Sequence, residues 1–108
     1  MADLYDTVVV ITGASSGVGR ATAHAFARQG ASLVLTARAP DPLEDVVAEC
    51  AACGGRAVAI PADVADADAM GRVADAAAER FGGLDVWVNN AGLGVVGRFD
   101  QVPLEAHR

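Results

Sequence analysis

Short runs of β-branched and other apolar residues alternate with longer helical segments in this chain, and this alternation constrains the fold more than any other feature. The short runs predict strands, because β-branched residues favour extended backbone and the runs end near glycine or other turn residues. Strands that alternate with helices through short connections form a parallel sheet with helices on both faces. We therefore expect an α/β fold of the Rossmann type, a doubly wound parallel sheet in the strand order 3-2-1-4. The predicted strands span residues 7–11, 32–37, 56–60 and 84–89.

Helix signals occupy the segments between these runs. Residues 17–29 contain no proline and are followed by a glycine, which is typical of the end of a helix. Asp41 and Pro42 predict the start of a second helix with Asp41 as its N-cap, and Glu44 lies where a capping box places an acid. A third helix is expected from about Asp66, because apolar residues recur there at helical spacing. Its predicted apolar face consists of Met70, Val73, Ala74, Ala77 and Phe81.

Composition and charge limit the class of protein. Hydrophobic residues make up 53% of the 108 residues and charged residues 20%, which supports one packed domain and argues against disorder. The formal net charge is −6 and no basic stripe is present, so we expect no nucleic-acid partner. Residues 1–6 carry no basic residue and the apolar run 8–11 is too short to span a bilayer. We therefore expect a cytoplasmic protein that does not bind membranes.

Cys50 and Cys53 form a C-x-x-C pair, for which a redox or metal role is an alternative to packing. Only His24 and His107 could complete a metal set, and neither lies at a ligand-like spacing. The pair also falls at the end of a predicted helix, where the helix dipole disfavours a thiolate. We expect a packing role and no metal. Cys50 shares its predicted helical face with Leu43, Val46 and Val47.

The first predicted strand runs directly into a glycine-rich turn, T-G-A-S-S-G-V-G, over residues 12–19. Ligands of a doubly wound sheet bind at the carboxyl ends of the strands, at the point where the strand order reverses. Glycines let the backbone approach a pyrophosphate closely, and free N–H groups at the start of the next helix face the anion. The candidate cofactor-binding residues of this turn are Gly13, Ser15, Ser16, Gly17, Val18 and Gly19.

Arg38, at the end of the second predicted strand, indicates which dinucleotide binds. In dinucleotide-binding folds this position commonly carries an acid that accepts a hydrogen bond from the adenine ribose, but the chain reads Thr36-Ala37-Arg38. A guanidinium pairs with a 2′-phosphate through its planar fork, whereas an acid would repel that phosphate. We therefore expect NADP(H) to be favoured over NAD(H); the alternative is that Arg38 is a solvated loop residue.

Three motifs, in the same order as in the family, make the chain resemble the short-chain dehydrogenase/reductase family. Residues 12–19 look like its T-G-x-x-x-G-x-G turn, Asp63-Val64 like its adenine-site pair, and residues 89–92 like its N-N-A-G. Each motif follows a predicted strand, and the resemblance covers residues 7–108. It implies a Rossmann-type fold and a nicotinamide dinucleotide as cofactor.

The resemblance also implies roles for the residues of the last two motifs. Asp63 would bond the adenine amino group, and the Val64 backbone would face the ring. A helix N-cap is the alternative for Asp63, although Asp66 is better placed for it. Asn90 would brace the fourth strand, for which capping of the strand end is a competing explanation. The residues implied to line the adenosine ribose are Asn90, Ala91 and Gly92.

The family's reaction needs residues that this chain lacks. By the resemblance, a serine and a Y-x-x-x-K pair are required, in which the tyrosine exchanges the proton and the lysine lowers its pKa. The chain has no lysine, its one tyrosine is Tyr5, and its serines are Ser15, Ser16 and Ser32. We therefore identify no catalytic residue, and expect residues 1–108 to be an NAD(P)-binding domain truncated before the catalytic segment and inactive alone.

The function implied is that of an NADP(H)-dependent oxidoreductase that transfers hydride between nicotinamide and an alcohol or carbonyl substrate, as a homo-oligomer. The alternative, from another class, is a module or remnant that binds NADP(H) without turnover. We expect a loop after Asn89, which would leave the fourth strand at an edge with unpaired backbone near residues 86–88. Self-association or marginal stability of the isolated chain would follow.

Other interpretations of the glycine turn fit less well. Residues 13–17 also satisfy G-x-S-x-G, the nucleophile elbow of α/β-hydrolases, with Asp85 or Asp100 and His107 downstream in triad order. An elbow takes its oxyanion loop from earlier strands, and only one strand precedes Ser15. A methyltransferase-like fold would want an acid at the end of the second strand, and no Gly-Lys-Ser/Thr exists for a P-loop.

Overall fold

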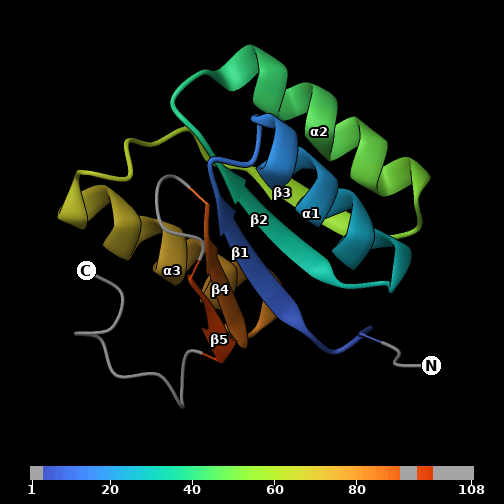
Figure 1. The fold of residues 1–108 in the computed structure, drawn as a ribbon. Coiled ribbons are helices and arrows are strands. Elements are labelled where there is room, and N and C mark those ends of the chain that lie inside the picture. The colour runs from blue at the N-terminus through green and yellow to red at the C-terminus, as the bar shows by residue number, and fades with distance from the viewer. Residues whose placement is uncertain (1–3, 91–94, 99–108) are drawn as a thin grey trace.

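The structure is a computed structural model that describes residues 4–90 and the backbone of residues 95–98. Strands and helices alternate as the sequence predicts, and a short fifth strand follows the fourth (Figure 1). The bounds of the predicted elements differ from the observed ones by a residue or two. In chain order the elements are β1 (Val8–Thr12), α1 (Gly17–Arg28), β2 (Ser32–Thr36), α2 (Pro40–Ala52), β3 (Arg56–Ala59), α3 (Ala67–Phe81), β4 (Val86–Asn89) and β5 (Val95–Arg98).

The strands form one sheet in the order β3-β2-β1-β4-β5. β1 pairs in parallel with β2 and β4, and β2 with β3, which confirms the predicted order 3-2-1-4. β5 runs antiparallel to β4, with Asn89 opposite Val95 and Val86 opposite Arg98. The expected loop and unpaired β4 edge are therefore wrong. A strand of four residues that contains Gly97 carries almost no periodic signal, and its partner β4 supplies the hydrogen bonds that define it.

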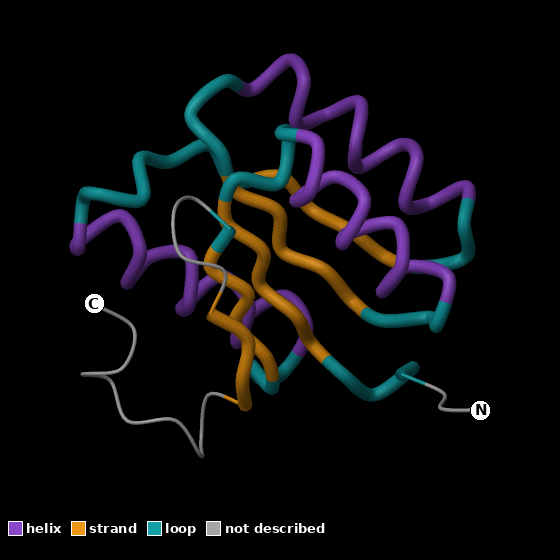
Figure 2. The backbone as a smooth tube through the Cα atoms, viewed as in Figure 1, coloured by secondary structure: helices purple, strands orange, loops and turns teal. Residues whose placement is uncertain are grey.

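α1 and α2 cover one face of the sheet and α3 covers the other (Figure 1). Val9 and Ile11 of β1 lie in the core cluster beneath α1 and α2. Val8 and Val10 point the other way and pack with Val73 of α3. Every residue of β1 and β2 is buried, as expected for parallel strands covered on both faces. The loops after β1, β2 and β3 leave the sheet at the same edge, as Figure 2 shows.

The two later helices begin differently from one another. α2 starts at Pro40 with Ala39 as its N-cap and no side-chain cap, so the predicted N-cap at Asp41 is wrong. Proline suits the first helical position because its φ is preset and its missing N–H would be unpaired there, so Pro40 itself can open the helix. α3 begins as predicted, and the Asp66 carboxylate accepts from Ala69 N at 3.1 Å.

Cys50 is fully buried in the core between α2 and the sheet, and Cys53 is the C-cap of α2. Both thiols are free. Burial raises the pKa of the Cys50 thiol to about 11, so it stays protonated at neutral pH and is a poor nucleophile or ligand. The placement supports the packing role. Within residues 4–90, no group of three or more His, Cys, Asp or Glu is placed to hold a metal, and no helix is long and apolar enough to cross a membrane.

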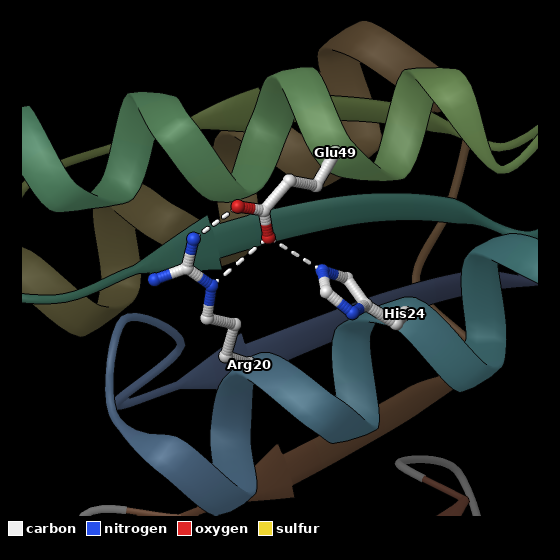
Figure 3. Close-up of polar contacts among 3 residues, drawn as sticks. All are labelled: Arg20, His24 and Glu49. Carbon is white, nitrogen blue, oxygen red and sulfur yellow. Dashed lines mark hydrogen bonds and ion pairs between the residues drawn. The ribbon is translucent and has the colours of Figure 1, made fainter.

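A polar cluster of Arg20, His24 and Glu49, which we call the Glu49 cluster, joins α1 to α2 (Figure 3). Glu49 of α2 accepts from Arg20 Nε at 2.9 Å and also pairs with Arg20 Nη2, and its Oε1 lies 2.6 Å from His24 Nε2. Arg20 and His24 are one turn apart on α1, so both reach the same carboxylate. Hydrogen bonds from Arg20 and then from His24 lower the pKa of Glu49 to about 2.

Candidate functional site

The glycine-rich turn lies between the carboxyl end of β1 and the first turn of α1. Gly13 follows β1 with a φ of 60°, in the left-handed region that favours glycine. Ala14 N donates to Thr36 O at 3.2 Å, and Ser16 N donates to Gly13 O at 3.2 Å. The Ser16 hydroxyl also donates to Gly13 O, at 2.8 Å. These bonds close the turn and fasten it to the end of β2.

Gly17 and Gly19 meet different surroundings although both belong to the predicted motif. A Cβ atom added to Gly17 would have no neighbouring atom within 4 Å. A Cβ added to Gly19 would clash with Gly13 O and lie 2.7 Å from Asn90 Nδ2. Gly19 is therefore needed for α1 to pack against the turn. The described residues leave the space beside Gly17 open, which suits the close approach of a ligand.

The first turn of α1 presents backbone N–H groups at this edge of the sheet. Its N-cap, Ser16, makes no side-chain hydrogen bond to the helix. Arg20 N donates to Ser16 O at 2.7 Å and begins the helical ladder, so the N–H groups of Gly17, Val18 and Gly19 precede it. Together with the positive end of the helix dipole, these three N–H groups form a site suited to a pyrophosphate.

A pocket of about 270 Å³ lies beside the turn. It opens between the carboxyl ends of β1 and β2 and the segment that follows β3. The predicted residues that the structure brings together around it are Gly13, Ser15, Arg38 and Val64. The adjoining turn and helix start carry Ser16, Gly17, Val18 and Gly19.

The pocket is also lined by residues that the sequence analysis did not assign to a ligand, namely Thr12, Thr36, Ala37 and Ala62. Thr12 and Thr36 are the last residues of β1 and β2. The same rule that located the glycine turn, that ligands bind at the carboxyl ends of parallel strands, could have identified both threonines. It could not have shown which of the two has a free hydroxyl, because that depends on neighbouring strands.

Arg38 and Asp63 approach one another beside the pocket. The Arg38 side chain is 81% exposed, and its Nε lies 3.8 Å from Asp63 Oδ1. The same Oδ1 accepts from Ala65 N at 2.9 Å, so Asp63 caps the short turn before α3. Asp66, not Asp63, is the N-cap of the helix. An arginine this exposed keeps its guanidinium accessible to an incoming anion.

Asn90 ties the end of β4 to the glycine turn. Its backbone N–H donates to Thr12 Oγ1 at 3.0 Å, and its Nδ2 lies 3.5 Å from Gly13 O and 3.4 Å from Ser16 Oγ. These contacts agree with a bracing role for Asn90. Ala91 and Gly92, the other two residues expected at the ribose, lie outside the described residues.

The hydrolase alternative does not fit the positions of its residues. Asp85 Oδ2 accepts from Val8 N at 2.8 Å. Val8 begins β1 and Ser15 follows its carboxyl end, so Asp85 and Ser15 lie at opposite edges of the sheet. This separation excludes Asp85 as the acid of a triad with Ser15. The remaining candidates, Asp100 and His107, lie outside the described residues.

The profile of a protein family described as "short chain dehydrogenase" matches residues 7–108, which is most of the chain. The chain belongs to the short-chain dehydrogenase/reductase family. The probable oxidoreductase EphD of Mycobacterium tuberculosis is 46% identical to it over 100 residues. L-rhamnose 1-dehydrogenase (NAD(P)(+)) of Azotobacter vinelandii is 43% identical over 108 residues. These matches cover 93% and 96% of this chain but only 17% and 42% of the relatives, so the chain spans less than half of their length.

Solved structures of the short-chain dehydrogenase/reductase family share the fold. L-sorbose reductase from Gluconobacter frateurii, complexed with NADPH and L-sorbose, gives a TM-score of 0.78 at 36% identity, over 96% of this chain and 40% of that one. A metagenomic short-chain oxidoreductase in complex with NADP gives 0.78 at 42% identity, over 84% and 41%. The likeness confirms the Rossmann-type arrangement of the described strands and helices.

Proposed function

We propose that residues 1–108 are the dinucleotide-binding domain of an NADP(H)-dependent oxidoreductase that transfers hydride between nicotinamide and an alcohol or carbonyl substrate. One observation carries the proposal: the glycine turn and an exposed arginine line the same pocket, and the turn leads directly into the start of α1, whose first N–H groups have no partner within the helix. Family membership supports the oxidoreductase class. The coenzyme, when bound, supplies or accepts the hydride, and the residues of this chain bind and orient it.

Three parts of the coenzyme, the pyrophosphate, the adenine and the adenosine ribose, are assigned to residues of this chain. The N–H groups of residues 17–19 suit the pyrophosphate, and the open space beside Gly17 lets that group come close to the backbone. Val64 lines the pocket, and its backbone is proposed to face the adenine ring. The neighbouring Asp63 carboxylate is proposed to accept from the adenine amino group. Asn90, Ala91 and Gly92 are proposed for the adenosine ribose.

Arg38 supports NADP(H) over NAD(H). It lines the pocket, and the strand end beside it, Thr36-Ala37, carries no carboxylate that would repel a 2′-phosphate. L-sorbose reductase, with a related fold, was solved with NADPH, whereas the L-rhamnose dehydrogenase is named for both coenzymes. The relatives therefore do not decide the preference, and the proposal depends on Arg38 itself.

Residues 1–108 are proposed to bind the coenzyme without turnover. It contains no lysine, and its one tyrosine, Tyr5, precedes β1 at the far end from the glycine turn. A Tyr–Lys pair that exchanges the substrate proton cannot be assembled from these residues.

Titration of the full-length protein with NADPH and with NADH, followed by nicotinamide fluorescence, tests the proposal. We expect the Kd for NADPH to be at least about tenfold lower than the Kd for NADH. A tenfold difference corresponds to about 1.4 kcal/mol, which one charge-assisted hydrogen bond to the 2′-phosphate can supply. Tighter binding of NADH, or no binding of either coenzyme, would contradict it.

A further inference from the structure

Within the described residues, two buried side-chain hydroxyls have no hydrogen-bond partner, and both belong to β2. They are Ser32 Oγ at the start of the strand and Thr36 Oγ1 at its end. Their residues are 1% and 2% exposed. A buried hydroxyl without a partner has lost its water and gained nothing in exchange, so each one destabilises the fold unless something else pairs with it.

The two hydroxyls share a face of the sheet but differ in surroundings. Side chains alternate along a strand, so Ser32 and Thr36 point to the same side, about 13 Å apart. Thr36 lines the pocket at the carboxyl edge, and Ser32 does not. Of the two residues, only Thr36 therefore adjoins the pocket proposed for the coenzyme.

Comparison with Thr12, the threonine opposite it on β1, shows how the hydroxyl of Thr36 differs. Thr12 pairs with Thr36 across β1 and β2, and both line the pocket. Thr12 Oγ1 accepts from Asn90 N at 3.0 Å and lies 3.1 Å from Asn89 Oδ1, so its capacity is used inside the protein. Among the described residues, none forms a hydrogen bond with the Thr36 hydroxyl. Thr36 holds the glycine turn through its backbone carbonyl, which accepts from Ala14 N, and not through its side chain.

We propose that Thr36 is a further coenzyme-binding residue, whose hydroxyl hydrogen-bonds the adenosine end of the dinucleotide. The inference rests on the proposed function, since it takes the pocket to be the coenzyme site. Rotation about χ1 exchanges the positions of the hydroxyl and the methyl of a threonine, so a side chain that lines the pocket can present its oxygen to a polar group there. Arg38, two residues on, lines the same pocket and would hold the 2′-phosphate.

Thr36→Val is the direct test, because valine keeps the shape and strand preference of threonine and lacks only the hydroxyl. In the full-length protein we expect the Kd for 2′,5′-ADP, measured by calorimetry, to rise about threefold to tenfold, the effect of one lost hydrogen bond. The Tm without ligand should be unchanged or higher, since an unpaired buried hydroxyl is gone. Thr36→Ser keeps the hydroxyl, and its Kd should stay close to that of the wild type.

Ser32→Ala is the matched control, because it removes the other unpaired hydroxyl from the same strand and the same face. We expect its Tm to be unchanged or higher and its Kd for 2′,5′-ADP to equal that of the wild type. Equal affinity of Thr36→Val and wild type would overturn the role of Thr36 while leaving the coenzyme site intact, as would equal weakening by both variants. If the wild type does not bind 2′,5′-ADP, the proposed function fails and this inference fails with it.

Discussion

Three glycines in residues 13–19 have different physical surroundings, although the motif makes them look equivalent. Gly13 adopts a left-handed φ that other residues rarely accept. Gly19 leaves no room for a Cβ because Gly13 O and Asn90 Nδ2 stand against it. Gly17 has open space on its Cβ side and an ordinary φ. Among the described residues nothing therefore requires glycine at position 17, and its proposed role is to let a ligand approach the backbone.

Alanine substitutions at two of these positions should separate binding from folding. For Gly17→Ala we expect a Tm unchanged or slightly raised, because alanine is the better helix former. Its Kd for NADPH should rise at least about tenfold, because the methyl group enters the space proposed for the pyrophosphate.

Gly19→Ala, the matched change within the same turn of α1, should lower the free energy of unfolding by about 1–3 kcal/mol, the usual effect of overpacking. Urea unfolding and fluorescence titration measure the two effects. Wild-type affinity in Gly17→Ala would show that the pyrophosphate does not lie against this residue.

Arg38→Asp tests the coenzyme preference at the level of one side chain. We expect NADPH binding to weaken by about tenfold to a hundredfold, because a charge-assisted contact is replaced by repulsion. NADH binding should change much less. Arg80→Asp makes the same charge change in the last turn of α3 and should leave the ratio of the two Kd values unaltered. An unaltered ratio in Arg38→Asp as well would remove Arg38 as the 2′-phosphate partner.

At the scale of elements, the Glu49 cluster is the polar contact that links α1 to α2, two helices otherwise joined through apolar packing. α1 carries the phosphate-facing N–H groups, so its position relative to the sheet matters for binding. Arg20 lies in the first turn of α1, next to Gly19, and its guanidinium is directed to α2 by Glu49 (Figure 3). The cluster therefore helps to hold the start of α1 without contributing to the pocket.

The lowered pKa of Glu49, about 2 against an ordinary 4.5, gives this contact a defined pH dependence. Folding favours the ionised carboxyl, so its stabilising effect is complete above about pH 4.5 and is lost as the pH falls towards 2. Glu49→Gln should therefore lower the free energy of unfolding at pH 7. The difference from wild type should shrink as the pH falls through that window.

Urea unfolding at pH 7, 5 and 3 measures this difference. Glu44→Gln, a change on the exposed side of the same helix, is the control and should show a much smaller effect at pH 7. Because the cluster is partly exposed, added salt should reduce the Glu49→Gln effect. A difference in unfolding free energy from wild type that stays constant down to pH 3 would show that ionised Glu49 does not stabilise the fold through this cluster.

At the scale of the whole molecule, the sheet is extended by one strand beyond the predicted order. β5 pairs with β4, so β5 and not β4 is the outermost of the described strands on this side of the sheet. Self-association of the isolated chain was expected because β4 would have an unpaired edge. Since β5 pairs with that edge, self-association stays a prediction without this support. The central strands β1 and β2 are buried throughout, and the glycine turn and Arg38 follow directly after their carboxyl ends.

Local chemistry accounts for what could be predicted from the sequence. The strands, the helices, the cap at Asp66 and the glycine turn are specified by residues close to one another in the chain, so their signals are visible without a structure. The order of the first four strands could then be predicted, because parallel strands are connected by right-handed crossovers and few strand orders satisfy this rule. The family motifs added the positions of Asp63 and Asn90.

The tertiary structure alone decided the contacts between segments far apart in the chain. β5 exists as a strand because β4 is beside it, and Gly19 leaves no room for a Cβ because Gly13 O and, from the end of β4, Asn90 lie against it. Thr12 and Thr36 look alike in the sequence, but only the neighbouring strand shows that one hydroxyl is paired and the other is not. Sequence patterns report which face a residue occupies, whereas hydrogen-bond partners and free space depend on distances that only the assembled sheet defines.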